Sequence, residues 1–275
     1  MKDNLESPMK KHHGKSIPIH WTRTFISDLV YYSSKIPLCT IEKNILLPEL
    51  ETLRQGREVR IGWASIFTKA MGIASIQFPE LRRAWIPFPY AHIYEHPIPI
   101  GSVAVQRNIE GHESVLFGMV QEPNNTDLGE ITQSLTDFKN APLDDLKLFK
   151  RIRRNSKLPW PIRSIIWNYG LHFSGYCKAK NLGTFGISSV AKYQANTMNL
   201  LSPLTSALNY STIQNNNECL IRMTFDHRIL DGGTVAQILG FLEETINQPI
   251  RNEILESSLF IPAEKKKGRA KKLRL

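Results

Sequence analysis

The sequence predicts one α+β domain, and three observations lead to that class. Apolar residues recur at helical spacing in several segments, strand-like runs lie between those segments, and turn residues join some runs directly. Strands joined as hairpins favour a mixed sheet with helices over a doubly wound parallel sheet. The chain has 275 residues, of which 41% are hydrophobic and 22% charged, so it can bury a sizeable core and is not disordered by composition.

Three helices are predicted in the N-terminal part of the chain. The segment 22–34 is amphipathic, because its apolar residues follow the helical period. A short helix is expected at 47–55, where Pro48 lies near the start and Gly56 acts as a stop signal. The segment 62–76 is predicted to be a buried helix, since bulky apolar residues recur along it at the same period.

Five strand-like runs and one more helix are predicted in the remainder. Asn215 to Asn217 lies between the last two runs and is a turn signal. The helical pattern returns over 231–248, with one apolar face. The five runs are 99–107, 115–121, 183–190, 206–213 and 219–225.

The stretch 142–180 has an unusual composition. It opens with a basic, amphipathic piece, is interrupted by Leu158 to Pro161, and continues with an aromatic piece over 162–177. One interpretation is a helical insertion that packs on the core. The other is an interfacial surface or a hydrophobic substrate wall, because basic residues beside tryptophan suit a lipid boundary.

Most of the net charge of +10 lies at the two ends of the chain. Residues 263–275 carry +6 and residues 1–16 carry +2, which leaves +2 for the body. A nearly neutral body argues against nucleic-acid binding. We expect a flexible N-terminal segment at 1–16, one folded domain at 17–260 and a solvated basic tail at 261–275. Binding of nucleic acid or an anionic surface is the alternative role for the tail.

Several classes of protein are disfavoured by what the sequence lacks. It has no uninterrupted apolar run of ~18 residues, so no transmembrane helix is expected. The polar N-terminus has no apolar core of a signal peptide. Cys39, Cys177 and Cys219 are odd in number and form no C-x-x-C pair, which disfavours a disulfide framework or a structural zinc site. A reducing cytoplasm is therefore the expected compartment.

The segment 221–234 places a histidine where it could do chemistry. A predicted strand ends at His227, and a helix begins at about Asp231, whose carboxylate favours the free N–H groups of the first turn. Histidine has an unperturbed pKa near ~6.5, so it can act as a base at neutral pH. A histidine with no other motif around it would more simply be a structural residue.

A serine in the strand-like run 183–190 is the second candidate. Alternate residues of a strand share one face, so Phe185, Ile187 and Ser189 lie on one side. Ser188 therefore points to the other side, together with Gly186. A hydroxyl on a rigid strand can donate a hydrogen bond to a developing oxyanion.

The two segments together resemble the catalytic domain of the dihydrolipoamide acyltransferases, the acyl-transferring components of 2-oxo acid dehydrogenase complexes. They resemble chloramphenicol acetyltransferase more distantly. The motif D-H-R-x-x-D-G spans Asp226 to Gly232, and G-T-F-x-I-S-S spans Gly183 to Ser189, followed by a stretch around Pro203. With Ile17 to Thr40, which also fits, the resemblance covers roughly residues 17–252.

The resemblance implies a chloramphenicol acetyltransferase-like fold, a two-layer mixed sheet with helices, in which residues 17–260 form the catalytic domain. It also implies roles: His227 is the general base, Ser188 donates to the tetrahedral oxyanion, and no covalent enzyme intermediate forms. Asp231 is structural and pairs with an arginine, for which Arg23 is the candidate, and Gly232 supports this turn. Coenzyme A carries the acyl group, and no metal is expected.

The family builds its active site between the subunits of a trimer, so His227 and Ser188 are expected to come from different chains of a homotrimer. The sequence also departs from the family. No lipoyl domain precedes the catalytic region, so no covalently bound lipoyl group is expected, and Leu38 stands where the family often has histidine. The insertion 142–180 lies directly upstream of the serine strand and is expected to remodel the acceptor pocket.

Three hypotheses for the function follow. The first is a stand-alone acyltransferase that uses acyl-CoA and an unidentified acceptor. The second is a lipoamide acyltransferase subunit of a 2-oxo acid dehydrogenase complex that uses a lipoyl domain of another chain. The third is a non-catalytic scaffold of the same fold. The expected location is cytoplasmic, with an anionic membrane surface as an alternative partner.

Overall fold

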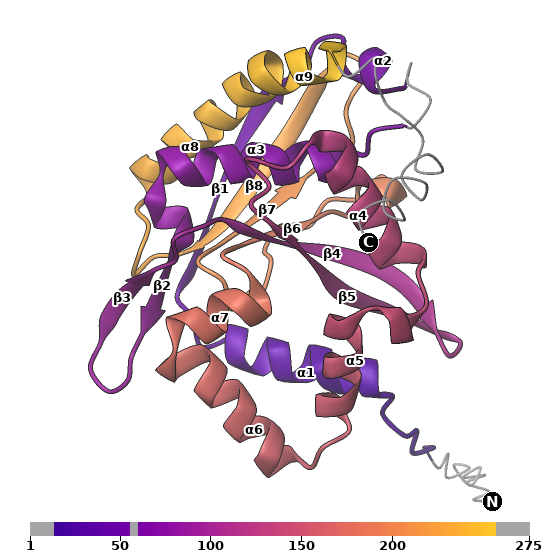
Figure 1. The fold of residues 1–275 in the computed structure, drawn as a ribbon, viewed down its shortest axis with the longest axis vertical. Coiled ribbons are helices and arrows are strands. Elements are labelled where there is room, and N and C mark those ends of the chain that lie inside the picture. Colours follow the sequence, from indigo (N-terminus) through magenta and orange to yellow (C-terminus); the bar gives the residue numbers. More distant parts are fainter. Residues whose placement is uncertain (1–13, 56–59, 257–275) are drawn as a thin grey trace, which may run out of the picture.

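The structure is a computed structural model, and it describes residues 14–55 and 60–256 (Figure 1). Most of the expected flexible segment 1–16, the stop signal at Gly56 and the basic tail 261–275 lie outside the described residues.

A six-stranded mixed sheet runs through the molecule in the order β1-β8-β7-β6-β4-β5. The central strands β7, β6 and β4 are parallel to one another, and the other neighbours pair antiparallel. A separate hairpin consists of β2 (Arg83–Ile86) and β3 (His92–Glu95). The strands of the large sheet are β1 (Leu38–Leu46), β4 (Ile100–Ile109), β5 (His112–Gln121), β6 (Phe185–Ser188), β7 (Ser206–Tyr210) and β8 (Glu218–Asp226).

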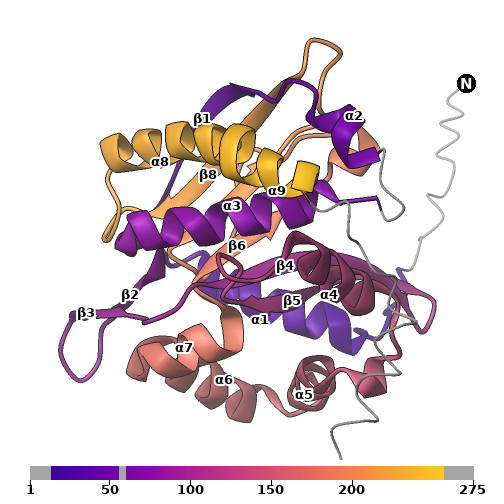
Figure 2. The same ribbon diagram turned by 45° about the horizontal axis from the view of Figure 1, so that its top comes forward.

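One face of the sheet is covered by α3 and α8, which Figure 2 shows side by side. Apolar residues at helical spacing give both helices a buried side, and Phe67, Met71 and Leu239 are fully buried in the main core. Phe185 and Ile187 of β6 reach the same core. The elements here are α2 (Leu50–Gln55), α3 (Trp63–Gln77), α4 (Leu128–Asn140), α8 (Gly232–Thr245), a π-helical turn (Ile246–Ile250) and α9 (Arg251–Glu256).

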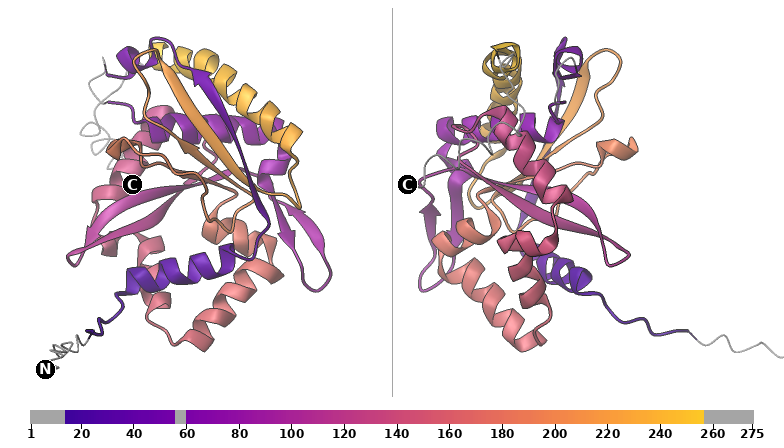
Figure 3. Two further views of the ribbon diagram at one scale, coloured as in Figure 1. Left: turned by 180° about the vertical axis from the view of Figure 1, so that it is seen from behind. Right: turned by 45° about the vertical axis from the view of Figure 1, so that its right-hand side comes forward.

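The opposite face of the sheet is covered by α1 and by the stretch 142–182, as Figures 2 and 3 show. The predicted insertion is therefore helical throughout most of its length. The expected fold had two layers, one sheet and one layer of helices, and the insertion adds a third layer. The elements are α1 (Trp21–Ser33), η2 (Leu143–Asp145), α5 (Lys147–Ser156), α6 (Trp160–Asn168), a π-helical segment (Tyr169–Phe173) and α7 (Gly175–Leu182).

The α+β class and the predicted elements are confirmed, with shifts at their ends. The run 183–190 forms a strand only over Phe185–Ser188, because Ser189 turns away and accepts from the amide of Ala191. The strands β1, β2 and β3 and the helix α4 were not predicted. β1 is an edge strand with both faces partly exposed, so its apolar alternation is weak.

A buried ion pair joins the insertion to α1. The Asp28 carboxylate accepts from Arg163 Nε at 2.8 Å and from a second guanidinium nitrogen at 3.2 Å. The Asp28 side chain is 3% exposed and that of Arg163 is 16% exposed. Asn168 donates to the Tyr32 hydroxyl at 2.9 Å, and the Tyr32 ring stacks on Trp167. These contacts hold α6 against α1.

Replacing Asp28 with asparagine should lower the free energy of unfolding by about 3 kcal/mol, because the Arg163 charge loses its buried partner. Urea denaturation at neutral pH measures this change. Asp144→Asn is the matched control, since Asp144 pairs with Arg153 at the surface with 65% of its side chain exposed. The control should cost less than ~1 kcal/mol. Equal losses for both variants would contradict this role of Asp28.

Candidate functional site

The chain enters β6 through a turn that only glycine suits. Gly183 ends α7 with φ +94°, and a Cβ atom there would lie 2.9 Å from the carbonyl oxygen of Ile100. The next residue, Thr184, donates its amide to that oxygen at 2.8 Å, and its hydroxyl accepts from the Ile100 amide at 2.9 Å. This junction pins β6 to β4 and fixes the strand that carries Ser188.

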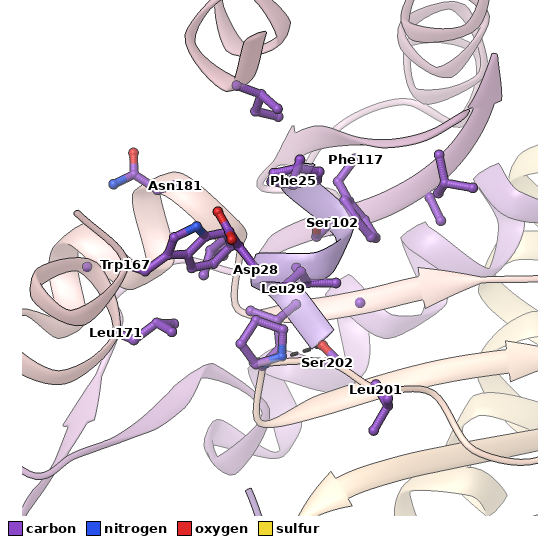
Figure 4. A pocket seen from close by; sticks show the side chains of 18 of the residues that line it. Phe25, Asp28, Leu29, Ser102, Phe117, Trp167, Leu171, Asn181, Leu201 and Ser202 are labelled. Carbon is purple, nitrogen blue, oxygen red and sulfur yellow. Dashed lines mark hydrogen bonds between the residues drawn. The ribbon is translucent and has the colours of Figure 1, made fainter. Parts of the chain in front are cut away.

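Ser188 lies on the strand face predicted for it. Phe185 and Ile187 point into the main core, whereas Gly186 and Ser188 line a cavity on the other face. The cavity has a volume of about 370 Å³ and lies between the sheet, α1 and the insertion (Figure 4). The helices α5 and α6 and the π-helical segment form much of the lining, and their role as a substrate wall stays a prediction.

Asn209 is a polar residue beside Ser188 that the sequence analysis missed. The two residues are paired in the register of β6 and β7, so their side chains share the cavity face of the sheet. Asn209 is 2% exposed, and its Nδ2 atom is buried with no hydrogen-bond partner. Asn209 does not line the cavity, so its buried amide lies behind the wall that carries Ser188. No sequence signal marked it, because it lies inside an ordinary strand pattern.

His227 follows the last residue of β8. Its backbone amide donates to the Pro37 carbonyl at 3.1 Å, and its ring contacts Phe225 edge-on. Half of the side chain is exposed. The imidazole is therefore held at its base and open at its tip, as the strand-to-helix junction predicted.

The structure brings His227 and Asp231 together, and it leaves Arg23 apart from them. His227 Nδ1 lies 3.5 Å from Asp231 Oδ1, and 86% of the Asp231 side chain is exposed. Among residues 14–55 and 60–256, no ion pair joins Asp231 to Arg23, which lies near the first turn of α1. A Cβ atom on Gly232 would lie 3.2 Å from Ile41, so this glycine lets α8 start close to β1.

Within one chain, Ser188 and His227 do not meet. Ser188 is in register with Asn209, which in turn is in register with Arg222 on β8. His227 therefore lies two strands away and five residues further along. At ~3.3 Å per residue and ~4.8 Å per strand, the two backbones are roughly 19 Å apart. His227 does not line the cavity that contains Ser188.

The strand end before His227 is tied down by buried charges. Asp226 is 1% exposed and accepts from Arg228 Nε at 2.9 Å and from its backbone amide at 3.0 Å. Lys178 of α7 is buried nearby, and its burial lowers its pKa to about 8, against the opposing attraction of Asp226. Arg228, the arginine of the D-H-R motif, therefore stabilises the turn that carries His227.

Lys178 should make stability depend on pH. Its pKa in the folded state, about 8, lies below its ordinary value of 10.5, so the folded chain binds fewer protons between these values. The free energy of unfolding therefore rises from pH 8 to 10.5, and the cost of charging Lys178 is present in full below pH 8. This cost is about 3 kcal/mol.

Lys178→Met should raise the free energy of unfolding at pH 7 by up to about 3 kcal/mol and flatten its rise above pH 8. Chemical denaturation between pH 6.5 and 10 measures both effects. Lys180→Met, at an exposed position on the same helix, should change neither. A loss of stability at pH 7 in the Lys178 variant would contradict the assignment.

The three cysteines lie away from the cavity. None of Cys39, Cys177 and Cys219 lines the cavity. Burial raises the pKa of Cys219 to about 11, so its thiol stays protonated at neutral pH.

The outer side of α6 is apolar and adjoins the basic helix α5. Ile162 and Ile165 are exposed to 47% and 69%, and Trp160 is exposed as well. No helix in the described ranges is long and apolar enough to cross a bilayer. Association with an anionic membrane surface stays a prediction.

No protein-family model and no curated protein matches the sequence. Solved structures match the fold. The dihydrolipoamide acetyltransferase of Azotobacter vinelandii aligns with a TM-score of 0.64 at 15% identity, over 90% of this chain and 96% of that chain. A probable dihydrolipoamide acetyltransferase from Listeria monocytogenes gives a TM-score of 0.58 at 17% identity, over 86% and 95%. The truncated catalytic core of the 2-oxoacid dehydrogenase complex from Thermoplasma acidophilum gives 0.62 at 14% identity, over 86% and 99%.

These similarities define the class of fold. The chain has the acyltransferase fold of the dihydrolipoamide acetyltransferase catalytic cores, over almost their whole length. The predicted chloramphenicol acetyltransferase-like α+β fold is confirmed. Because a fold does not fix a function, the activity depends on the residues of the site.

Proposed function

We propose that this chain is a stand-alone acyltransferase that moves an acyl group from a coenzyme A thioester to a thiol or hydroxyl acceptor. The observation that carries the proposal is Ser188 in the wall of a cavity. A hydroxyl donor on a rigid strand suits an oxyanion. The D-H-R-x-x-D-G segment supplies the base, His227.

The chemistry assigns one proton transfer to His227. Its Nε2 atom removes the proton of the acceptor thiol or hydroxyl, whose sulfur or oxygen attacks the thioester carbonyl carbon. The tetrahedral oxyanion accepts a hydrogen bond from the Ser188 hydroxyl. Collapse breaks the carbon–sulfur bond, and the departing thiolate takes the proton back from His227. Asp231, on the Nδ1 side of the ring, favours the tautomer that leaves Nε2 free.

We infer that the reacting pair is completed by a second chain. The separation of roughly 19 Å between Ser188 and His227 within one chain is too large for both groups to touch one carbonyl. In a closed ring, His227 of one chain can face Ser188 of the next. A homotrimer is the expected assembly, and Asp231 could then meet the Arg23 of a neighbouring chain.

The fold relatives support these roles. The Azotobacter vinelandii structure comes from a study of a serine, a histidine and an asparagine in the catalytic mechanism of that enzyme. The histidine and the asparagine lie four positions apart there, as His227 and Asp231 do here. The serine precedes the histidine in both chains.

Two alternatives differ in their acceptor or their chemistry. A lipoamide acyltransferase that uses another chain's lipoyl domain would prefer dihydrolipoamide over other thiols. A non-catalytic scaffold would release no coenzyme A from any acyl-CoA. Ser188 in the wall of a largely apolar cavity favours a catalytic site over a scaffold.

His227→Ala should lower the rate of coenzyme A release from acyl-CoAs by at least ~10²-fold, because the general base is lost. Ser188→Ala should lower it by ~10²–10³-fold. Thiol release from a panel of acyl-CoAs, followed by a colorimetric thiol reagent, measures both. His92→Ala, in the β2–β3 hairpin, is the matched control and should leave the rate unchanged. Unchanged turnover in the His227 variant would refute its role as the base.

A further inference from the structure

We propose that the cavity beside Ser188 holds a straight hydrocarbon chain of about ten to twelve carbons, carried by one of the two substrates. The inference rests on the proposed acyl transfer and names its substrate class. The chain would extend from the reacting carbonyl or nucleophile at Ser188 into the space between the sheet and the insertion.

The wall of the cavity is chemically suited to a hydrocarbon. Phe25 and Leu29 of α1 face it from one side, and Phe117 of β5 closes the sheet side (Figure 4). Trp167 and Leu171 of the insertion complete it. Of the charged residues in the lining, Asp28 and Arg163 are paired with each other, and Arg151 of α5 is the remaining cation. Transfer of methylene groups from water to such a lining is favourable.

The volume sets the length of the chain. The cavity measures about 370 Å³. At ~30 Å³ for each methylene, like a water molecule in the liquid, this space takes at least about a dozen such groups. An acetyl group would leave most of this apolar space without a partner, so a short acyl group explains the cavity poorly when the acceptor is also small.

The cavity is held open by contacts that do not involve a ligand. The ion pair of Asp28 and Arg163 and the stacking of Tyr32 on Trp167 fix the insertion at a set distance from α1. Phe149 of α5 is fully buried and anchors the start of the insertion. The space is therefore preformed, which lowers the entropic cost of binding.

Two small residues offer places to block the cavity. Ala104 lies on β4 and lines the cavity, in the sheet position next to Ser188. Gly170 lines it within the insertion, and a Cβ atom there would meet no atom within 4 Å. Ile165 on α6 is 69% exposed and does not line the cavity, so it offers a control position on the insertion.

The test is a chain-length series in three arms. Calorimetric titration with straight-chain carboxylates of four to sixteen carbons measures binding without turnover. Coenzyme A release from acyl-CoAs of the same lengths, with 2-mercaptoethanol as acceptor, tests the donor. Acetyl-CoA with straight-chain alkane thiols tests the acceptor. The affinity for the carboxylates should rise about fourfold per methylene up to about twelve carbons, and kcat/KM should rise equally in one of the two reaction arms. A buried methylene contributes ~0.8 kcal/mol, and ~1.4 kcal/mol corresponds to a tenfold change.

The blocking variants make the test specific to this cavity. Gly170→Phe should abolish the gain beyond about six carbons and keep turnover of the shortest substrates within a few-fold. Ala104→Leu, beside Ser188, should weaken binding of chains of every length. Ile165→Phe should leave the length series as in the native protein. Thermal unfolding of both variants shows whether each of them folds, so the test does not depend on one position.

The outcomes separate this inference from the proposed function. Turnover that needs His227 but is indifferent to chain length in every arm overturns the inference and leaves the acyl transfer standing. Length-dependent binding that Gly170→Phe abolishes, with no turnover of any acyl-CoA, supports the hydrocarbon site and overturns the acyl transfer. Affinity that rises with length equally in the blocked variants also overturns the inference.

Discussion

The pairing of β6, β7 and β8 is the constraint on which the site depends. Hydrogen bonds between these strands fix where Ser188 and His227 stand along the sheet, and the register separates them. A strand pair cannot slip by one residue without turning every side chain to the other face, so this separation is rigid. In the proposed function, each chain therefore carries two half-sites at distant points of one sheet, and catalysis by both residues together requires a second chain.

The insertion determines the shape of the space beside Ser188. In place of a short connection, residues 142–182 lay helices over the cavity face of the sheet. Their inner side is mostly apolar, and the Asp28–Arg163 pair holds them in place. In the proposed function, rigid strands position the reactive groups, while a separate helical layer sets the shape of the substrate space. This division lets one acyltransferase fold accept different substrates.

Local pattern was enough to predict the parts of the site that lie within one element. The two-residue period of β6 placed Ser188 opposite Phe185, and the strand-to-helix junction placed His227 near Asp231. The closure of the cavity could not be predicted in this way, because Asp28 and Arg163 are 135 positions apart and the sequence gives no sign that they pair. Asn209 was also missed, since its significance comes from a neighbour on another strand.

The central claim is that one active site takes its base and its oxyanion donor from two chains, and mixed assemblies test it most directly. Chains with Ser188→Ala and chains with His227→Ala are each inactive on their own in this account. When the two are expressed together in equal amounts and purified as one assembly, roughly a quarter of the shared sites contain both native residues. The account predicts roughly a quarter of the native rate of coenzyme A release, and a mixed assembly as inactive as either variant alone would contradict it.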